Sequence, residues 1–173
     1  LGPLASVSQA EKVRDQVQRS VEMGARVLAG GEPRGADYPP TILTDVKPGM
    51  PVFDEEVFGP VAPFTEAQDT EEAVKLANSS GFGLGVSLFT DDLDKAGQLV
   101  TEFGDGAVFV NAMVKSDPRL PFGGTKRSGY GRELAMNGIR EFVNVQTVYM
   151  DKFRDFQLKK NKDVVISTGK TAR

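Results

Sequence analysis

The unit that most constrains the fold of this chain runs from residue 86 to residue 111. Residues 86–90 (VSLFT) predict a strand, Asp91 or Asp92 caps an amphipathic helix, and residues 107–111 (AVFVN) predict a buried apolar strand. Two strands that are joined by one helix run parallel, and such crossovers are right-handed. The sequence therefore predicts an α/β fold with a mostly parallel sheet and flanking helices.

Weaker patterns on both sides of this unit extend the α/β prediction. Ser8 and Glu11 have the spacing of a capping box, so Ser6 or Ser8 is expected to begin a helix that ends near Met23. Asp69 or Thr70 is expected to cap another helix. The remaining predicted elements are strands at 25–29, 41–46 and 61–66, a helix at 132–142, and a half-exposed strand at 143–149.

The composition excludes several classes of protein. At 173 residues the chain forms one domain, or one large domain with a smaller appendage. It carries 21 Lys and Arg against 24 Asp and Glu, so it lacks the basic excess of a nucleic-acid-binding protein. No apolar run approaches the roughly 20 residues that span a bilayer. No charged and apolar leader points to secretion, so we expect a cytoplasmic protein.

The absence of cysteine and histidine is equally informative. It excludes a disulfide framework, a thiolate zinc site, a thiol nucleophile and an imidazole base. Acid–base chemistry would fall to carboxylates, Lys or Tyr, and the sequence predicts no catalytic residue and no metal site. The chain also starts at Leu1 rather than Met, which indicates either processing or a piece of a longer protein.

A glycine-rich stretch at 120–133 follows the predicted strand–helix–strand unit. Its four glycines, at 123, 124, 129 and 131, allow backbone angles and close approaches that other residues do not. A plain glycine-rich turn is the alternative. The spacings of a phosphate-binding loop and of G-x-G-x-x-G are both absent. Ligands of parallel sheets gather beyond the carboxyl ends of the strands, which is where this stretch is expected.

The loop at 55–60 (EEVFGP) is the first candidate binding segment. Glu56 and Phe58 are two residues apart, so their side chains point the same way if the segment is extended. A carboxylate that accepts hydrogen bonds from vicinal hydroxyls, beside a flat apolar ring, suits a ribose with its attached base. The alternative is a solvated Glu56 and a core Phe58.

The segment from Asn111 to Phe122 is the second candidate. Met113 and Phe122 would supply an apolar wall for a ligand. Three polar side chains could bind a carboxylate by charge and hydroxyl donation, namely Lys115, Ser116 and Arg119. The alternative is that Lys115 and Arg119 are ordinary surface charges.

Residues 55–60 and 121–133 (PFGGTKRSGYGRE) together resemble the C-terminal part of the NAD(P)-dependent aldehyde dehydrogenase superfamily. The flanks at 1–4, 81–85 and 110–111 fit the same pattern, and the similarity runs from about residue 1 to 150 in matching order and spacing. The sequence SDPR at 116–119 is similar to the succinate-semialdehyde branch of the superfamily.

This resemblance implies a fold, a reaction and roles for the candidate residues. Residues 1–142 would be a partial catalytic (substrate) domain, 143–150 an oligomerisation strand that joins a neighbouring subunit's sheet, and 151–173 a charged tail. Glu56 would hold the nicotinamide-ribose hydroxyls of NAD or NADP, and Phe58 would pack against the nicotinamide. The aldehyde pocket would be lined by Phe122, with substrate choice set in the loop by Met113, Lys115, Ser116 and Arg119.

The departures from the family pattern set limits on what this chain does alone. The family's nucleophile is a cysteine, and its cofactor-binding domain and general-base glutamate have no match here. We therefore expect an inactive fragment of a homo-oligomeric enzyme that oxidises an aldehyde, shortened by nature, by proteolysis or on purpose. The alternative is a non-catalytic oligomerising or ligand-binding module that reuses the fold.

Overall fold

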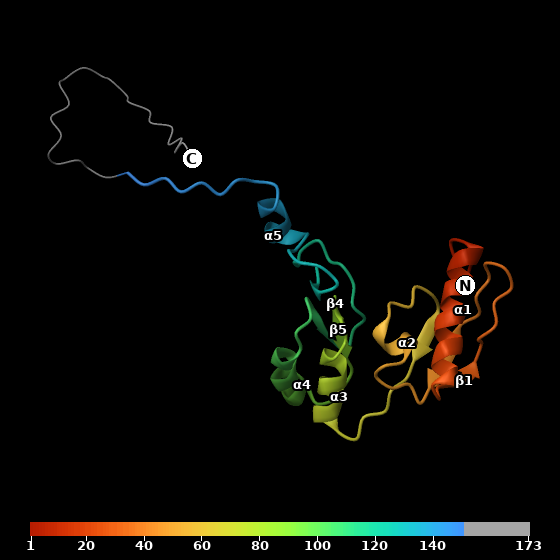
Figure 1. Ribbon diagram of the computed structural model, residues 1–173. Helices are drawn as coiled ribbons and strands as arrows, with labels where there is room; N and C mark the ends of the chain where they lie inside the picture. Colours follow the sequence, from red (N-terminus) through yellow and green to blue (C-terminus); the bar gives the residue numbers. More distant parts are fainter. Residues whose placement is uncertain (151–173) are drawn as a thin grey trace, which may run out of the picture. The chain divides into compact units, whose positions relative to one another are not determined.

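The computed structural model describes residues 1–150 (Figure 1). The chain divides into a compact unit, Leu1–Val143, and a second unit, Asn144–Arg173. Residues 144–150 are exposed and form no helix or strand within the described part of the chain. The strand expected at 143–149 is therefore not formed in the single chain, and an oligomerisation role for 143–150 stays a prediction. The predicted tail at 151–173 lies outside the described residues, and the boundaries assigned to 1–142 stay a prediction as well.

Helix α1 (Val7–Glu22) begins where the Ser6 side chain accepts a hydrogen bond from the backbone N–H of Gln9, at 3.1 Å. The N-cap is thus Ser6, and the capping box expected from Ser8 is not used because Ser8 already lies inside the first turn. One face of α1 is buried, and two of its five buried residues are polar. The buried residues of α1 are Ala10, Val13, Gln16, Val17 and Ser20.

A three-stranded sheet packs with α1 around the main core. Strand β1 (Arg26–Ala29) is antiparallel to β2 (Thr41–Thr44), which is parallel to β3 (Val61–Pro63). A short helix, α2 (Pro51–Asp54), lies between β2 and β3 and was not expected from the sequence. The main cluster of buried apolar side chains comprises Val17, Ala25, Leu43, Val46, Met50 and Val52.

The expected strand–helix–strand unit is present. Strand β5 (Val86–Leu88) runs parallel to β6 (Val108–Val110), and they are joined by α4 (Leu93–Leu99) and a 3-10 turn, η1 (Val100–Glu102). All three residues of β6 are half-buried, so the expectation of a fully buried strand was wrong: this two-stranded sheet has no third strand beside it within residues 1–150.

Helix caps in this part of the chain agree with the sequence. Asp69 caps α3 (Thr70–Asn78) and Asp92 caps α4, each by accepting a hydrogen bond from a backbone N–H three residues on. Helix α5 (Ala135–Arg140) is shorter than the helix expected at 132–142, and Gly138 lies within it rather than breaking it.

A third sheet, made of two short antiparallel strands, shows that the prediction of one mostly parallel sheet was wrong. Strand β4 (Phe82–Gly83) pairs antiparallel with β7 (Thr125–Lys126), inside the glycine-rich stretch. The described residues therefore form three small sheets, in which β2–β3 and β5–β6 are parallel whereas β1–β2 and β4–β7 are antiparallel. The α/β class holds, but as separate short ladders.

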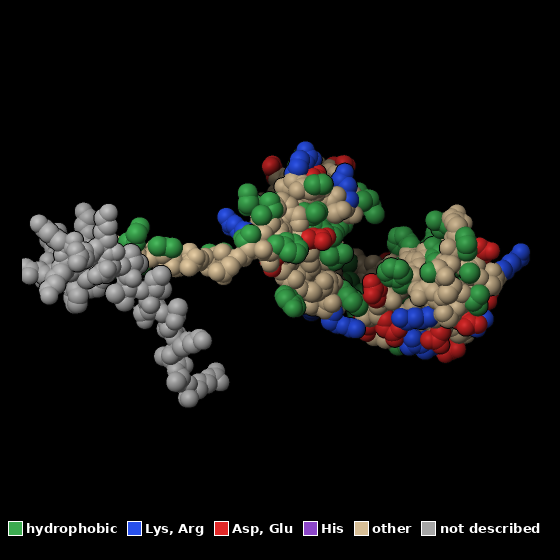
Figure 2. All heavy atoms as spheres, turned by 90° about the horizontal axis from the view of Figure 1, so that it is seen from above, with side chains coloured by type: hydrophobic (Ala, Val, Ile, Leu, Met, Phe, Trp, Pro, Cys, Tyr) green, Lys and Arg blue, Asp and Glu red, His purple; other side chains and the backbone are tan. Residues whose placement is uncertain are grey.

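Apolar side chains are frequent on the surface, as the green atoms in Figure 2 show. The exposed large apolar residues include Phe58, Phe64, Phe89, Leu93, Met113, Tyr130, Met136, Ile139 and Phe142. No helix among residues 1–150 combines the length and the apolar character that crossing a membrane requires.

Candidate functional site

The loop at 55–60 leaves α2 in an extended conformation and is fixed at both ends. The backbone N–H of Glu55 donates to the carbonyl of Pro51 at 2.9 Å, and the carbonyl of Pro60 accepts from the N–H of Thr41 at 2.9 Å, just before β3 begins. Within the loop, the N–H of Gly59 donates to the carbonyl of Val57 at 3.0 Å. The backbone of the candidate cofactor segment is therefore well defined.

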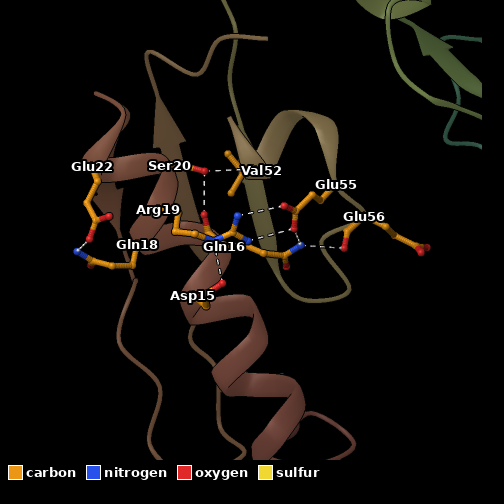
Figure 3. A network of polar contacts seen from close by, with 9 residues as sticks. All are labelled: Asp15, Gln16, Gln18, Arg19, Ser20, Glu22, Val52, Glu55 and Glu56. Atoms are coloured by element: carbon orange, nitrogen blue, oxygen red, sulfur yellow. Dashed lines mark hydrogen bonds and ion pairs between the residues drawn. The ribbon is translucent and has the colours of Figure 1, made fainter. Parts of the chain in front are cut away.

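Side chains alternate along this loop. Val57 packs against both buried clusters of the core, whereas Glu56 is exposed and Phe58 is 70% exposed. The alternative of a core Phe58 is therefore wrong. No hydrogen bond or ion pair within residues 1–150 engages the Glu56 carboxylate, and Figure 3 shows its side chain directed away from α1. A free carboxylate acceptor next to an exposed ring is a combination that suits a ribose and its attached base.

Glu55 has a different role from its neighbour. Its carboxylate accepts hydrogen bonds from Arg19 at 3.2 Å and from Gln16 at 2.9 Å, both on α1 (Figure 3). These bonds, that of Arg19 above all, hold the pKa of Glu55 below its ordinary value. Of the two adjacent glutamates, Glu55 thus bonds to α1, whereas the Glu56 carboxylate has no hydrogen bond or ion pair among residues 1–150.

The second candidate loop starts at Asn111, at the carboxyl ends of β5 and β6. The Asn111 side chain accepts from the N–H of Thr90 at 2.9 Å and donates to the carbonyl of Thr90 at 2.8 Å. Asn111 adopts a positive φ of 52°, which asparagine tolerates better than most residues. The sequence analysis missed this role; its signal was an asparagine placed directly after a strand.

The candidate substrate residues lie on the surface of this loop. Met113 is 72% exposed, and Lys115, Ser116 and Arg119 are exposed as well. Arg119 forms a two-point ion pair with Asp117, with N···O distances of 2.9 and 2.6 Å, and this pair holds the pKa of Asp117 well below its usual range. Arg119 is thereby engaged, while no hydrogen bond or ion pair within residues 1–150 engages Lys115 or Ser116.

Phe122 lines a cavity of about 440 Å³ with other residues of the glycine-rich stretch, such as Tyr130 and Arg132. The wall also includes Leu84 and, at and after α5, Gly138, Glu141 and Phe142. Its backbone pairs with Glu133 through two hydrogen bonds of 2.9 and 2.8 Å. The cavity wall includes neither the loop at 113–119 nor the Glu56–Phe58 pair. The structure therefore shows three candidate segments, each ordered locally, and it does not join them in one cleft.

The glycine-rich stretch is not an open loop: its side chains bond to the backbone of residues 78–83 and to its own backbone, and together they form a backbone clasp. The Lys126 ammonium group donates to the carbonyls of Asn78 and Ser80 at 2.8 and 3.0 Å, and the Ser128 hydroxyl accepts from the N–H of Gly83 at 3.1 Å. The Arg132 guanidinium donates to the carbonyl of Gly124 at 2.8 Å. All three polar side chains therefore form hydrogen bonds with backbone carbonyl or amide groups.

Within residues 1–150, no group of three or more acidic, histidine or cysteine side chains lies close enough to hold a metal ion. The cysteine count is zero over the whole sequence, so no thiol nucleophile is available from this chain.

The comparison with protein families decides the lineage. The model of the aldehyde dehydrogenase family matches residues 1–148. The chain belongs to the aldehyde dehydrogenase family.

Several named relatives of this chain are succinate-semialdehyde dehydrogenases. The chain is 46% identical over 155 residues to the succinate semialdehyde dehydrogenase [NAD(P)+] Sad of Escherichia coli, covering 88% of this chain and 34% of Sad. It is also 46% identical over 153 residues to a probable succinate-semialdehyde dehydrogenase [NADP(+)] of Synechocystis, covering 87% and 34%. The chain thus spans about a third of the length of these relatives.

Solved structures of family members resemble the fold closely. The succinic semialdehyde dehydrogenase of Streptococcus pyogenes, in complex with NADP+, matches with a TM-score of 0.83 and 36% identity over 88% of this chain and 34% of that one. A salicylaldehyde dehydrogenase of Pseudomonas putida G7 matches with a TM-score of 0.85 and 32% identity over 90% and 32%. The α/β architecture described above is that of the corresponding part of an aldehyde dehydrogenase.

Proposed function

We propose that this chain is part of an NAD(P)+-dependent dehydrogenase that oxidises succinate semialdehyde to the acid. The observation that carries the proposal is the exposed pair Glu56 and Phe58 on a loop whose carbonyls at both positions are hydrogen-bonded to α1 and whose Glu55 carboxylate is engaged by α1. The names of the relatives support the substrate class. The cofactor supplies a hydride acceptor when bound.

In this proposal the residues of the chain bind and orient. The Glu56 carboxylate accepts hydrogen bonds from the ribose hydroxyls next to the nicotinamide, and the Phe58 ring limits the space in which the nicotinamide can lie. Phe122 forms an apolar wall for the aldehyde. Lys115 and Ser116 bind the distal carboxylate of a semialdehyde, because Arg119 is neutralised by Asp117.

The covalent step requires a nucleophile that this chain does not contain, since its sequence has no cysteine. We therefore expect the 173-residue chain alone to give no turnover with succinate semialdehyde and either nicotinamide cofactor. A chimera in which residues 1–150 replace the matching segment of E. coli Sad should restore turnover. Turnover by the chain alone would refute our account of the nucleophile.

Substrate selection can be tested in the same chimera. Lys115→Met combined with Ser116→Ala should raise KM for succinate semialdehyde about tenfold or more, as expected for losing hydrogen bonds to a charged group. The KM for butyraldehyde, which lacks the distal carboxylate, should stay within about twofold. Equal changes for both aldehydes would contradict a carboxylate-binding role.

The alternative, a non-catalytic oligomerising or ligand-binding module, is favoured by the missing cysteine. Residues 143–150 remain our proposed oligomerisation strand, because the apolar Val143, Val145, Val148 and Met150 are exposed, and Val143 and Val145 alternate with Asn144 and Gln146. Light scattering of the 173-residue chain and of a chain that ends at residue 142 distinguishes the possibilities. We expect the full chain to associate and the shortened chain to do so less.

A further inference from the structure

One face of α1 contacts the candidate cofactor loop at several points. The Gln9 side-chain amide donates to the carbonyl of Phe58 at 2.7 Å, and the Gln16 amide donates to the carbonyl of Glu56 at 3.3 Å. Gln9 and Gln16 are seven residues, two helical turns, apart, so they lie on the same face of α1. The backbones of both proposed cofactor residues are thus hydrogen-bonded to one helix.

Gln16 is the central contact of this face. It is buried, with 1% of its surface exposed, although it is polar. Its amide group uses both donors on the loop: one on the carbonyl of Glu56 and one on the Glu55 carboxylate at 2.9 Å (Figure 3). Because both amide donors of this buried side chain bond to the same loop, Gln16 fixes the position of that loop in addition to filling space in the core.

Two further contacts complete the attachment. Arg19 holds the Glu55 carboxylate from the next turn of the helix and is itself paired with Asp15 at 2.9 Å. Between Gln9 and Gln16, Val13 packs so closely on Gly59 that a Cβ at position 59 would lie 2.9 Å from a Val13 methyl group. Glu55, Val57 and Gly59 therefore face the scaffold, whereas Glu56 and Phe58 are exposed.

We propose that α1 is a positioning element for cofactor binding, with Gln16 and Gln9 as positioning residues that set the placement of Glu56 and Phe58. This inference rests on the proposed function, since it takes Glu56 and Phe58 to be the cofactor contacts. In this proposal part of the cofactor affinity depends on α1, a helix outside the binding loop. The proposal also explains why the buried face of α1 contains Gln16.

The test compares Gln16→Met, Gln9→Met and Gln18→Met in the Sad chimera. Methionine preserves the length of glutamine but donates no hydrogen bond. Gln18 is the matched control: it lies on the same helix and its amide bonds to Glu22 at 3.0 Å, without contacting the loop. We expect Gln16→Met to raise KM for the cofactor about fivefold and Gln9→Met less, with kcat and the aldehyde KM within about twofold.

A second arm separates this inference from the proposed function. Glu56→Ala should raise the cofactor KM by itself, and adding Gln16→Met to Glu56→Ala should then change it no further, because the positioned carboxylate is gone. If Glu56→Ala has no effect, the proposed cofactor role of Glu56 is wrong. If Glu56→Ala acts but Gln16→Met equals Gln18→Met, only the positioning role is overturned.

A third measurement does not depend on an active chimera. Hydrogen exchange on the full 173-residue chain should show faster exchange at the hydrogen-bonded loop amides of Glu55 and Gly59 in Gln16→Met and Gln9→Met than in Gln18→Met. Faster exchange throughout the core in Gln16→Met alone would indicate a general packing defect, and Gln9→Met, which alters a half-buried residue, then decides. Unchanged exchange at Glu55 and Gly59 in both variants overturns the inference.

Discussion

The side chains of residues 7–63 form a closed core. Between residues 70 and 142, by contrast, Ala96 has the only apolar side chain that is buried. The first region buries large side chains completely, with Leu43 at 0% exposure, and its strands surround them. In the second region, α3 buries no residue and both strands β5 and β6 are half-buried throughout. The two regions carry different candidate segments and stabilise them differently.

Close backbone approach takes the place of a core in the second region. The N–H of Gly106 donates to the carbonyl of Gly83 at 3.0 Å, and a Cβ at position 106 would overlap the carbonyl of Gly123. A Cβ at position 124 would likewise overlap Ser128. The two regions thus support their candidate residues differently. Glu56 and Phe58 lie on a loop that is packed against the hydrophobic core, whereas Phe122 and the loop before it are held by close backbone contacts.

The largest expected difference between the regions concerns leucine truncation. Leu43→Ala should lower the free energy of unfolding by about 2–5 kcal/mol, because it opens a cavity in the closed core. Leu93→Ala, at a side chain that is 65% exposed on α4, should change it by about 0.5 kcal/mol or less. Urea unfolding followed by circular dichroism measures both. Similar losses for the two variants would contradict the contrast in packing.

Within the second region, two glycine-to-alanine substitutions should change the free energy of unfolding in opposite directions. Gly106→Ala should destabilise by about 1–3 kcal/mol, since the added methyl group forces the backbone at Gly123 to move. Gly97→Ala, inside α4 with open space around it, should stabilise by about 0.5–1 kcal/mol because alanine favours the helix. Thermal unfolding of both variants checks this. A tolerated Gly106→Ala would show that the clasp is looser than described.

The smallest expected effect is the response of the loop at 55–60 to acid. The pKa of Glu55 is lowered in the folded chain by Arg19 and Gln16, so its bonds stabilise α1 against the loop at neutral pH. This contribution is present above the ordinary glutamate pKa of 4.5 and is lost as the pH falls through the lowered value. Backbone amide shifts of residues 55–59 should follow this titration, whereas those of 106 and 123 should not.

The control for the acid response is Arg19→Met, which removes the largest cause of the lowered pKa. In this variant the transition of residues 55–59 should move upward toward the ordinary glutamate pKa. An unchanged midpoint would mean that Arg19 does not hold the Glu55 carboxylate in solution.

Features that depend on neighbouring residues in the chain were predictable. The caps at Asp69 and Asp92 and the parallel pairing of β5 with β6 follow from local patterns. Two-residue alternation also agrees with the exposure of Glu56 and Phe58 on either side of Val57, which packs on the core. Local rules suffice where a segment's conformation is decided by its own residues.

Features that depend on long-range contacts were not predictable in the same way. The pairing of β4 with β7 joins segments about forty residues apart, and two-residue strands leave no periodic signal. The burial of β6 depends on how many strands and helices cover it. For Gln16 a signal did exist, since a glutamine interrupting the apolar face of a helix has to find a partner when it is buried.

The Asn111 amide described above also has an evolutionary consequence. By bonding both to the N–H and to the carbonyl of Thr90, it continues the β5–β6 ladder for one more rung with a side chain instead of a backbone. Beyond this rung a hydrogen bond from the N–H of Val114 to the Ser87 hydroxyl, at 3.1 Å, attaches the chain to β5. Lys115 and Ser116 lie outside that attachment and are exposed. Their side chains can therefore change while Asn111 and Val114 keep the loop on the strands, and under the proposed function such changes would alter the aldehyde preference.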